Sequence, residues 1–320
     1  MQTGAVSLPW GINRLNQISP DRLYLASGAI LLACLSLTLG DALIKQQSAS
    51  FLLWQIFLLR SAIAVPLLVY MLRLRSCSAL LMPQRLGWTL LRSLILVVMW
   101  LFYFIALSQV EFALAAAAFY TLPIFITLFA AWFLKNRVSK AGWFAVILGF
   151  IGSLFILQPQ ADSFNPYALL PLVSAICYAS AMILTRSKCQ QEKPLVLSLW
   201  MNITFIFVGA FAMLVLTIVE VTPLQAAQQP FLLGEWKTMD LADWRNMAIL
   251  ALVIVVASVV TAYAYQKAPS SLVASFDLSY LPFAVLWGFL FFDELPGPEI
   301  LLGIILIVSA GLIALRSAVR

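Results

Sequence analysis

Four ionisable side chains lie inside long apolar stretches of this sequence: Asp41, Arg60, Arg92 and Asp277. An unpaired charge at the centre of a membrane-crossing helix costs about 2.5 kcal/mol or more, so such residues usually pair with each other or contact a solute. All of them except Asp41 are therefore candidates for binding a substrate. The two aspartates, Asp41 and Asp277, are candidates for coupling substrate movement to an ion.

The depth of each charge in its apolar stretch leaves different alternatives open. Arg60 lies in the middle of WQIFLLRSAIAVPLL, so it either faces a cavity or locks helices together. Arg92 and Asp277 each lie about 10 Å from the same end of their stretches at 1.5 Å per residue, and we expect them to pair. Alternatively, Arg92 extends to lipid headgroups. Asp41 lies near the end of its stretch and could instead be a solvated carboxylate.

Aromatic residues with polar groups form a second candidate set. A tyrosine hydroxyl inside a membrane needs a hydrogen-bond partner, so these rings are expected to face the protein interior. Packing is the common role of any single ring, but together they indicate a cavity with amphipathic walls. The predicted substrate-binding residues of this kind are Tyr103, Tyr120, Tyr178, Trp200, Tyr263 and Tyr280, with Tyr265 close by.

Composition shows which elements must position these residues. Hydrophobic residues make up 63% of the 320-residue chain, charged residues 10%, and the mean hydropathy is +1.00. Charged residues normally supply about a quarter of a soluble chain, so lipid must be the main solvent. Apolar runs of roughly twenty residues favour helices over barrel strands. We predict an all-α integral membrane protein with ten transmembrane helices at 23–44, 51–72, 86–107, 112–134, 142–158, 167–185, 195–219, 246–265, 271–292 and 299–315. The connection between 220 and 244 is expected to be irregular.

The chain repeats itself at an offset of 159 residues without a gap, which places Pro123 on Pro282 and Gly152 on Gly311. Predicted helices four and five thus correspond to nine and ten, five helices later, so equivalent helices cross in opposite directions. We expect inverted five-helix repeats at 23–158 and 165–316, an arrangement typical of secondary transporters. Pro123 and Pro282 would bend matching helices, as hinges or as static kinks.

Most lysines and arginines fall in the connections on one side of the predicted helices, together with residues 1–22. Basic residues mark the cytoplasmic side, so a cytoplasmic N-terminal tail and a cytoplasmic C-terminus are predicted. The net charge of +6 then serves membrane insertion and requires no nucleic acid. The sequence has no histidine, no metal-ligand spacing of its four cysteines and no P-loop, so we expect no cofactor, no metal and no enzymatic activity.

Three stretches, FYFIALSQVEFALAAAAFYTLPIFITLFAAWFL, WQIFLLRSAIAVP and DLSYLPFAVLWGFLFFDELP, resemble the EamA-type carriers of the drug/metabolite transporter superfamily. The resemblance covers about residues 23–316, and SYLP…DELPG is most similar to the S-adenosylmethionine-uptake subgroup. The family glutamate after helix four is replaced here by Lys135-Asn136-Arg137, whereas Asp293-Glu294 follows helix nine. The resemblance implies an inner-membrane carrier with a central cavity, in which Arg60 matches the arginine of the second helix.

The predicted function is secondary transport of a small amphipathic metabolite by alternating access. An amino acid, a nucleoside-like compound and an S-adenosylmethionine-like compound are the candidate substrates. The alternatives are a multidrug exporter and, from other classes, a channel or an intramembrane transferase. The expected partners are the substrate and the lipid bilayer, and the protein is expected to be a monomer or a homodimer.

Overall fold

The computed structural model describes residues 20–75, 81–133, 140–157, 165–219, 221–267 and 278–319, and no strand occurs in these ranges. The all-helical prediction is therefore confirmed. The helices of the first half are α1 (Pro20–Gln47), α2 (Leu53–Arg75), α3 (Leu86–Leu107), α4 (Phe112–Phe119), α5 (Leu122–Phe133) and α6 (Lys140–Leu157). Those of the second half are α7 (Leu170–Ser187), α8 (Pro194–Ile218), α11 (Leu241–Lys267), α13 (Tyr280–Phe292) and α14 (Pro298–Val319).

Six helices are long and apolar enough to cross a membrane: α1, α2, α3, α7, α8 and α11. Shorter apolar helices occupy the remaining predicted segments, at Phe112–Ile126, Trp143–Gly152, Tyr280–Phe292 and Pro298–Ala310. The chain is thus a multi-pass membrane protein.

The connection after α8 is not wholly irregular as predicted. It contains the short helices α9 (Pro223–Gln228) and α10 (Pro230–Leu233), and α11 begins five residues before the predicted position of 246. Thr222 caps α9 by accepting a hydrogen bond from the backbone N–H of Gln225, whose side chain accepts from the backbone N–H of Thr222 in return. This reciprocal capping and the proline at the first position explain why a polar stretch begins a helix here.

The fourth predicted segment is two helices rather than one kinked helix. α4 ends at Phe119 with Tyr120 as its C-cap, and α5 starts with a hydrogen bond of 2.9 Å from the backbone N–H of Ile124 to the carbonyl of Thr121. Pro123 therefore lies in the first turn of α5, where a missing N–H breaks no helical hydrogen bond. Pro282 likewise lies in the first turn of α13. Both prolines thus lie in the first turn of a helix, and their role as hinges or static kinks stays a prediction.

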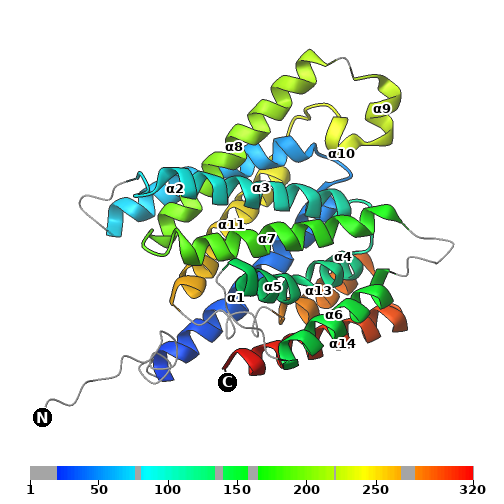
Figure 1. Cartoon of the computed structure of the whole chain (residues 1–320). Helices are drawn as coiled ribbons and strands as arrows, with labels where there is room; N and C mark the ends of the chain where they lie inside the picture. Colours follow the sequence, from blue (N-terminus) through cyan, green and yellow to red (C-terminus); the bar gives the residue numbers. More distant parts are fainter. Residues whose placement is uncertain are drawn as a thin grey trace, which may run out of the picture.

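Helices that are distant in sequence form the main interfaces. α2 packs on α8, α3 on α7, α1 on α11, and α6 on α14, and the last pair lies side by side in Figure 1. Glycine allows a close approach of α6 to α14: a Cβ on Gly152 would lie 3.0 Å from the carbonyl oxygen of Gly303. These interfaces enclose an aromatic core to which Phe57, Tyr103 and Phe104 contribute.

Candidate functional site

Three predicted site residues meet in a buried hydrogen-bonded relay. The hydroxyl of Tyr280 on α13 donates to the carboxylate of Asp41 on α1. The hydroxyl of Tyr103 on α3 lies 2.9 Å from that of Tyr280. Because Tyr280 has only one proton and donates it to Asp41, Tyr103 is the donor in the second bond. Asp41 is 2% exposed, so it is not the solvated helix-end carboxylate that the sequence left open.

The relay lies at the break between α4 and α5 and at the start of α13. Tyr120 caps the C-terminal end of α4, and its ring stacks on that of Tyr280 with centroids 4.8 Å apart. Tyr280 is the first residue of α13. Interrupted helices leave main-chain groups without helical partners inside the membrane, and transporters commonly bind solutes at such places. The C-terminal end of α4 and the first residue of α13 therefore meet through a pair of stacked tyrosines.

Arg60 of α2 is buried among aromatic rings. Its guanidinium carbon lies 4.6 Å from the ring centroid of Phe205 and 5.5 Å from that of Phe57, and the residue is 2% exposed. Its Nε and Nη2 atoms have no hydrogen-bond partner. The charge of Asp41 attracts the guanidinium without a direct ion pair. A buried cation whose hydrogen-bond donors lack partners destabilises the protein, unless a solute or a second conformation provides acceptors for those donors.

Arg92 occupies a separate polar position between α3 and α7. Its Nε donates to the hydroxyl of Thr185 at 2.6 Å, while Nη1 has no partner. The hydroxyls of Thr89 and Ser93, on the same helix, are also buried without partners. Arg92 is 3% exposed and does not extend to headgroups in this conformation. The predicted partner, Asp277, lies outside the described residues.

The remaining predicted residues divide into two groups. Tyr178 packs close to the relay, because the ring of Phe119 lies 5.8 Å from that of Tyr178 and 5.2 Å from that of Tyr103. Trp200 does not join it, because its indole N–H donates to the carbonyl of Leu81 at 2.9 Å. Tyr263 is 47% exposed and lies apart from the relay.

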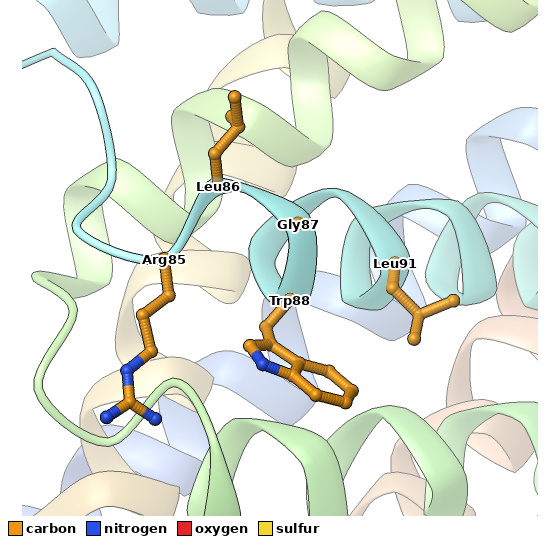
Figure 2. A pocket seen from close by; sticks show the side chains of 5 residues that line it. All are labelled: Arg85, Leu86, Gly87, Trp88 and Leu91. Atoms are coloured by element: carbon orange, nitrogen blue, oxygen red, sulfur yellow. The ribbon is translucent and has the colours of Figure 1, made fainter.

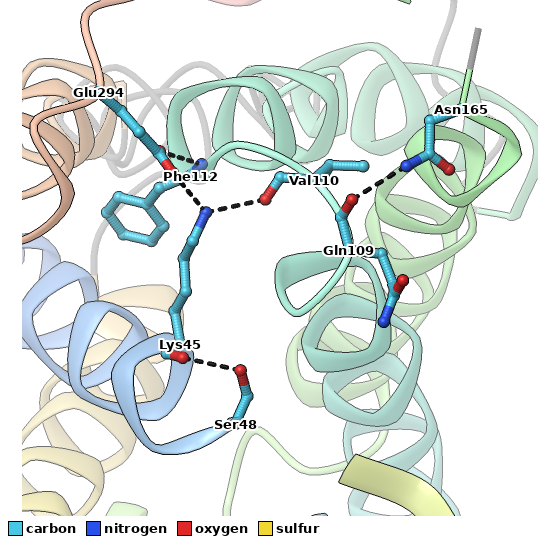
Figure 3. A network of polar contacts seen from close by, with 7 residues as sticks. All are labelled: Lys45, Ser48, Gln109, Val110, Phe112, Asn165 and Glu294. Atoms are coloured by element: carbon cyan, nitrogen blue, oxygen red, sulfur yellow. Dashed lines mark hydrogen bonds and ion pairs between the residues drawn. The ribbon is translucent and has the colours of Figure 1, made fainter. Parts of the chain in front are cut away.

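A polar network that the sequence did not predict joins both halves at one end of the bundle (Figure 3). The ammonium of Lys45 lies 2.8 Å from a carboxylate oxygen of Glu294 and donates to the carbonyl of Val110 at 2.9 Å. The second carboxylate oxygen of Glu294 accepts from the backbone N–H of Phe112 at 2.7 Å. Glu294 thus caps α4 and pairs with α1. Asp293 has a φ of 53°, a left-handed conformation that turns the chain at the end of α13.

This geometry suits binding rather than covalent chemistry. The relay supplies a polarised row of hydroxyls ending in a carboxylate, Arg60 supplies free donors, and the surrounding rings supply apolar faces. Among the described residues, no cluster of three or more histidine, cysteine or acidic side chains could hold a metal.

Comparison with known proteins gives a consistent result. The EamA-like transporter family matches residues 25–158. Riboflavin transporters of Rhizobium johnstonii and Vibrio cholerae are 32% and 30% identical, the first over 67% of this chain and 65% of its own length, the second over 78% of each. A pseudopaline exporter of Pseudomonas aeruginosa is 27% identical over 89% of this chain and 95% of its own. Other similar proteins are named as S-adenosylmethionine uptake transporters.

A solved structure described as "Crystal structure of protein" shares the fold, with a TM-score of 0.64 and 16% identity over 92% of this chain and 98% of its own. The relatives' names are those of transporters and not of enzymes. Similarity to the Vibrio cholerae protein extends over most of both chains. The chain therefore belongs to the EamA-like transporter family, within the drug/metabolite transporter superfamily of small-molecule transporters.

Proposed function

We propose that this protein is a secondary carrier that moves a small amphipathic metabolite by alternating access. The observation that carries the proposal is Arg60, a buried cation with two unpartnered nitrogens beside a buried carboxylate relay. The substrate has a flat apolar part that packs on the aromatic rings and at least one acceptor group that binds the Arg60 guanidinium. Because Arg60 is buried in this conformation, binding requires an opening movement.

Two inverted halves, at 23–158 and 165–316, make that movement possible. The packing supports this arrangement. Inverted halves are related by a two-fold operation that exchanges α1 with α7 and α3 with α11. This operation places the α1–α11 interface on the α7–α3 interface, and both are among the main contacts. The same relation maps the α2–α8 and α6–α14 interfaces onto themselves. Ten crossings and rocking of one half against the other follow from this proposal.

The distribution of basic residues supports an inner-membrane location with both termini in the cytoplasm. In that orientation the Lys45–Glu294 network lies at the outer end of the bundle. Arg92 and Thr185 then lie on the cytoplasmic side of the relay. We infer that a solute moving between Arg60 and the cytoplasm passes Arg92, whose unpartnered Nη1 offers a second donor.

The first compounds to screen follow from the relatives' names. Riboflavin and S-adenosylmethionine each combine a flat ring system with polar groups, which fits aromatic walls with one cation and one carboxylate. A ligand that binds the folded protein raises its melting temperature, by an amount that grows with its concentration relative to the Kd. Thermal-shift screening of the purified protein against such metabolites therefore identifies candidates without assuming a direction of transport.

Flux into proteoliposomes then tests the proposal. A carrier gives saturable uptake that unlabelled substrate competes away. Conductance that does not saturate with solute concentration would indicate a channel and refute the proposal. Competition by structurally unrelated drugs would favour the alternative, a multidrug exporter.

A further inference from the structure

A hollow of about 610 Å³ opens on the surface at the start of α3, away from the tyrosine relay. Its lining residues are Arg85, Leu86, Gly87, Trp88 and Leu91 (Figure 2). Figure 2 shows the side chains of Arg85, Trp88 and Leu91 extending from the same side of the helix. A cation therefore lies beside an aromatic ring and an aliphatic chain at the end of a membrane-crossing helix.

A second cation, from the end of α7, lies against one of the lining residues. The ammonium of Lys188 lies 5.3 Å from the ring centroid of Trp88. Both Arg85 and Lys188 are exposed, and neither forms an ion pair within the described part of the chain. With Arg85 in its lining and Lys188 against Trp88, and neither paired with a carboxylate, the hollow is complementary to an anion.

The acidic residue next to the hollow is already engaged. The carboxylate of Glu192 accepts hydrogen bonds from the backbone N–H groups of Gln84 at 3.1 Å and Arg85 at 2.8 Å. This carboxylate satisfies main-chain donors at the start of α3, so the hollow does not depend on a free helix end. The groups left to bind a ligand are the two basic side chains.

The apolar part of the hollow continues along α3. Leu86, Trp88, Leu91 and Leu94 are 41%, 41%, 43% and 47% exposed. On a helix that crosses the membrane, such residues face lipid chains, and tryptophan favours the level of the headgroups. A soluble anion would use the cations alone, whereas a lipid would use both the cations and this apolar strip.

We propose that the hollow binds an acidic phospholipid. Arg85 and Lys188 contact the phosphate of its headgroup, and its acyl chains lie along Trp88, Leu91 and Leu94. A basic pocket between membrane helices suits such headgroups, because each cation near an anionic lipid adds attraction. The bound lipid bridges the ends of α3 and α7, the two helices joined deeper in the bundle by Arg92 and Thr185.

Native mass spectrometry of the full-length protein in detergent tests this proposal with three lipids: cardiolipin, phosphatidylglycerol and phosphatidylethanolamine. The unmodified protein should retain the anionic lipids in preference to phosphatidylethanolamine. The double variant Arg85→Gln/Lys188→Gln should lose this binding by about tenfold or more. The matched control Lys237→Gln/Arg245→Gln, two exposed basic residues elsewhere on the chain, should keep it.

Several outcomes would overturn the proposal. These are equal binding of all three lipids, undiminished anionic-lipid binding by the double variant, and an equal loss in the control. Displacement of the lipid by millimolar inorganic phosphate would assign the hollow to a soluble anion instead. If the double variant has a lowered Tm, Trp88→Leu tests the proposal instead. This variant keeps both charges, so it should weaken lipid retention without changing the binding of inorganic phosphate.

Discussion

Replacing Glu294 with glutamine tests the network that joins the two halves, since the amide keeps the size of the carboxylate and removes its charge. The carboxylate accepts from the Lys45 ammonium at 2.8 Å and from the Phe112 N–H at 2.7 Å. Glutamine has a single acceptor oxygen, so its NH₂ group must face one of these two donors. Both charged side chains are largely shielded, at 14% and 20% exposure.

The magnitude follows from these contacts. A hydrogen bond to a charged group contributes about 1.5–3 kcal/mol, so Glu294→Gln should destabilise the protein by about 2–3 kcal/mol. Lys45→Met should cost less, about 1–2 kcal/mol, because Glu294 keeps its bond to the Phe112 N–H. The double variant should be more stable than the sum of the single losses implies, by about 1–2 kcal/mol, since neither charge is left without its partner.

Melting of the detergent-solubilised protein, followed by tryptophan fluorescence, provides the assay. On the scale of about 2–4 °C per kcal/mol found for mid-sized proteins, Glu294→Gln should lower the apparent Tm by about 4–12 °C. Glu299→Gln is the control, because Glu299 is exposed in the first turn of α14 and should change the Tm only slightly. Strictly additive losses, or equal losses for Glu294→Gln and Glu299→Gln, would show that the Lys45–Glu294 network does not stabilise the fold.

Three further changes probe other parts of the structure. Gly152→Val should destabilise the protein by about 1–3 kcal/mol and lower its Tm, because a Cβ at this position would lie 3.0 Å from α14. Gly28→Ala, whose Cβ has open space around it, should leave the Tm unchanged, and equal Tm values for the two variants would contradict the α6–α14 interface. Tyr280→Phe removes the hydroxyl that donates to Asp41 and should reduce the initial rate of uptake into proteoliposomes at least about tenfold. Tyr70→Phe, whose side chain is 61% exposed, should leave that rate unchanged, and a wild-type rate for Tyr280→Phe would show that transport does not need the relay. Burial raises the pKa of the Cys189 thiol, so the thiol stays protonated at neutral pH. By peptide mass spectrometry, Cys189 should react with maleimide more slowly in the folded than in the denatured protein, and its rate in the folded protein should increase with pH. Equal rates in the folded and denatured protein at pH 7 would show that Cys189 is not buried.

The helices were predictable because a bilayer imposes a simple requirement. A membrane-crossing helix needs about twenty apolar residues, and composition alone shows where these occur. The predicted segment 86–107 matches α3, and 51–72 differs from α2 by two or three residues at each end. The interruption between α4 and α5 was not predicted, because a proline in an apolar run is compatible with either a kink or a new helix.

The members of the site were largely predictable, whereas their arrangement was not. Asp41 and Tyr280 are 239 residues apart, and Tyr103 and Tyr280 are 177 apart, so their contacts depend on how each helix is rotated about its axis. Tyr263 shows the difficulty, since it is 47% exposed while Tyr265, two residues later on α11, is 2% exposed. Hydropathy does not distinguish the faces of a helix that is apolar on all sides.

The same reason explains why the Lys45–Glu294 pair was missed. The two residues are 249 positions apart, and each lies at the end of a helix, where a charged residue is normally solvated. Only the left-handed turn at Asp293, which the sequence does not reveal, brings Glu294 to the start of α4.

Whether Arg60 binds the transported solute is tested most directly by comparing Arg60→Gln with the unmodified protein in proteoliposome uptake of a ligand found by thermal shift. Arg60 recognises the solute in this account, so the variant should lose saturable uptake down to the protein-free background, while Arg245→Gln, an exposed arginine, should retain it. The glutamine variant should also lose the ligand-induced rise in Tm and still melt cooperatively. Wild-type KM and maximal rate in a folded Arg60→Gln protein would contradict the account.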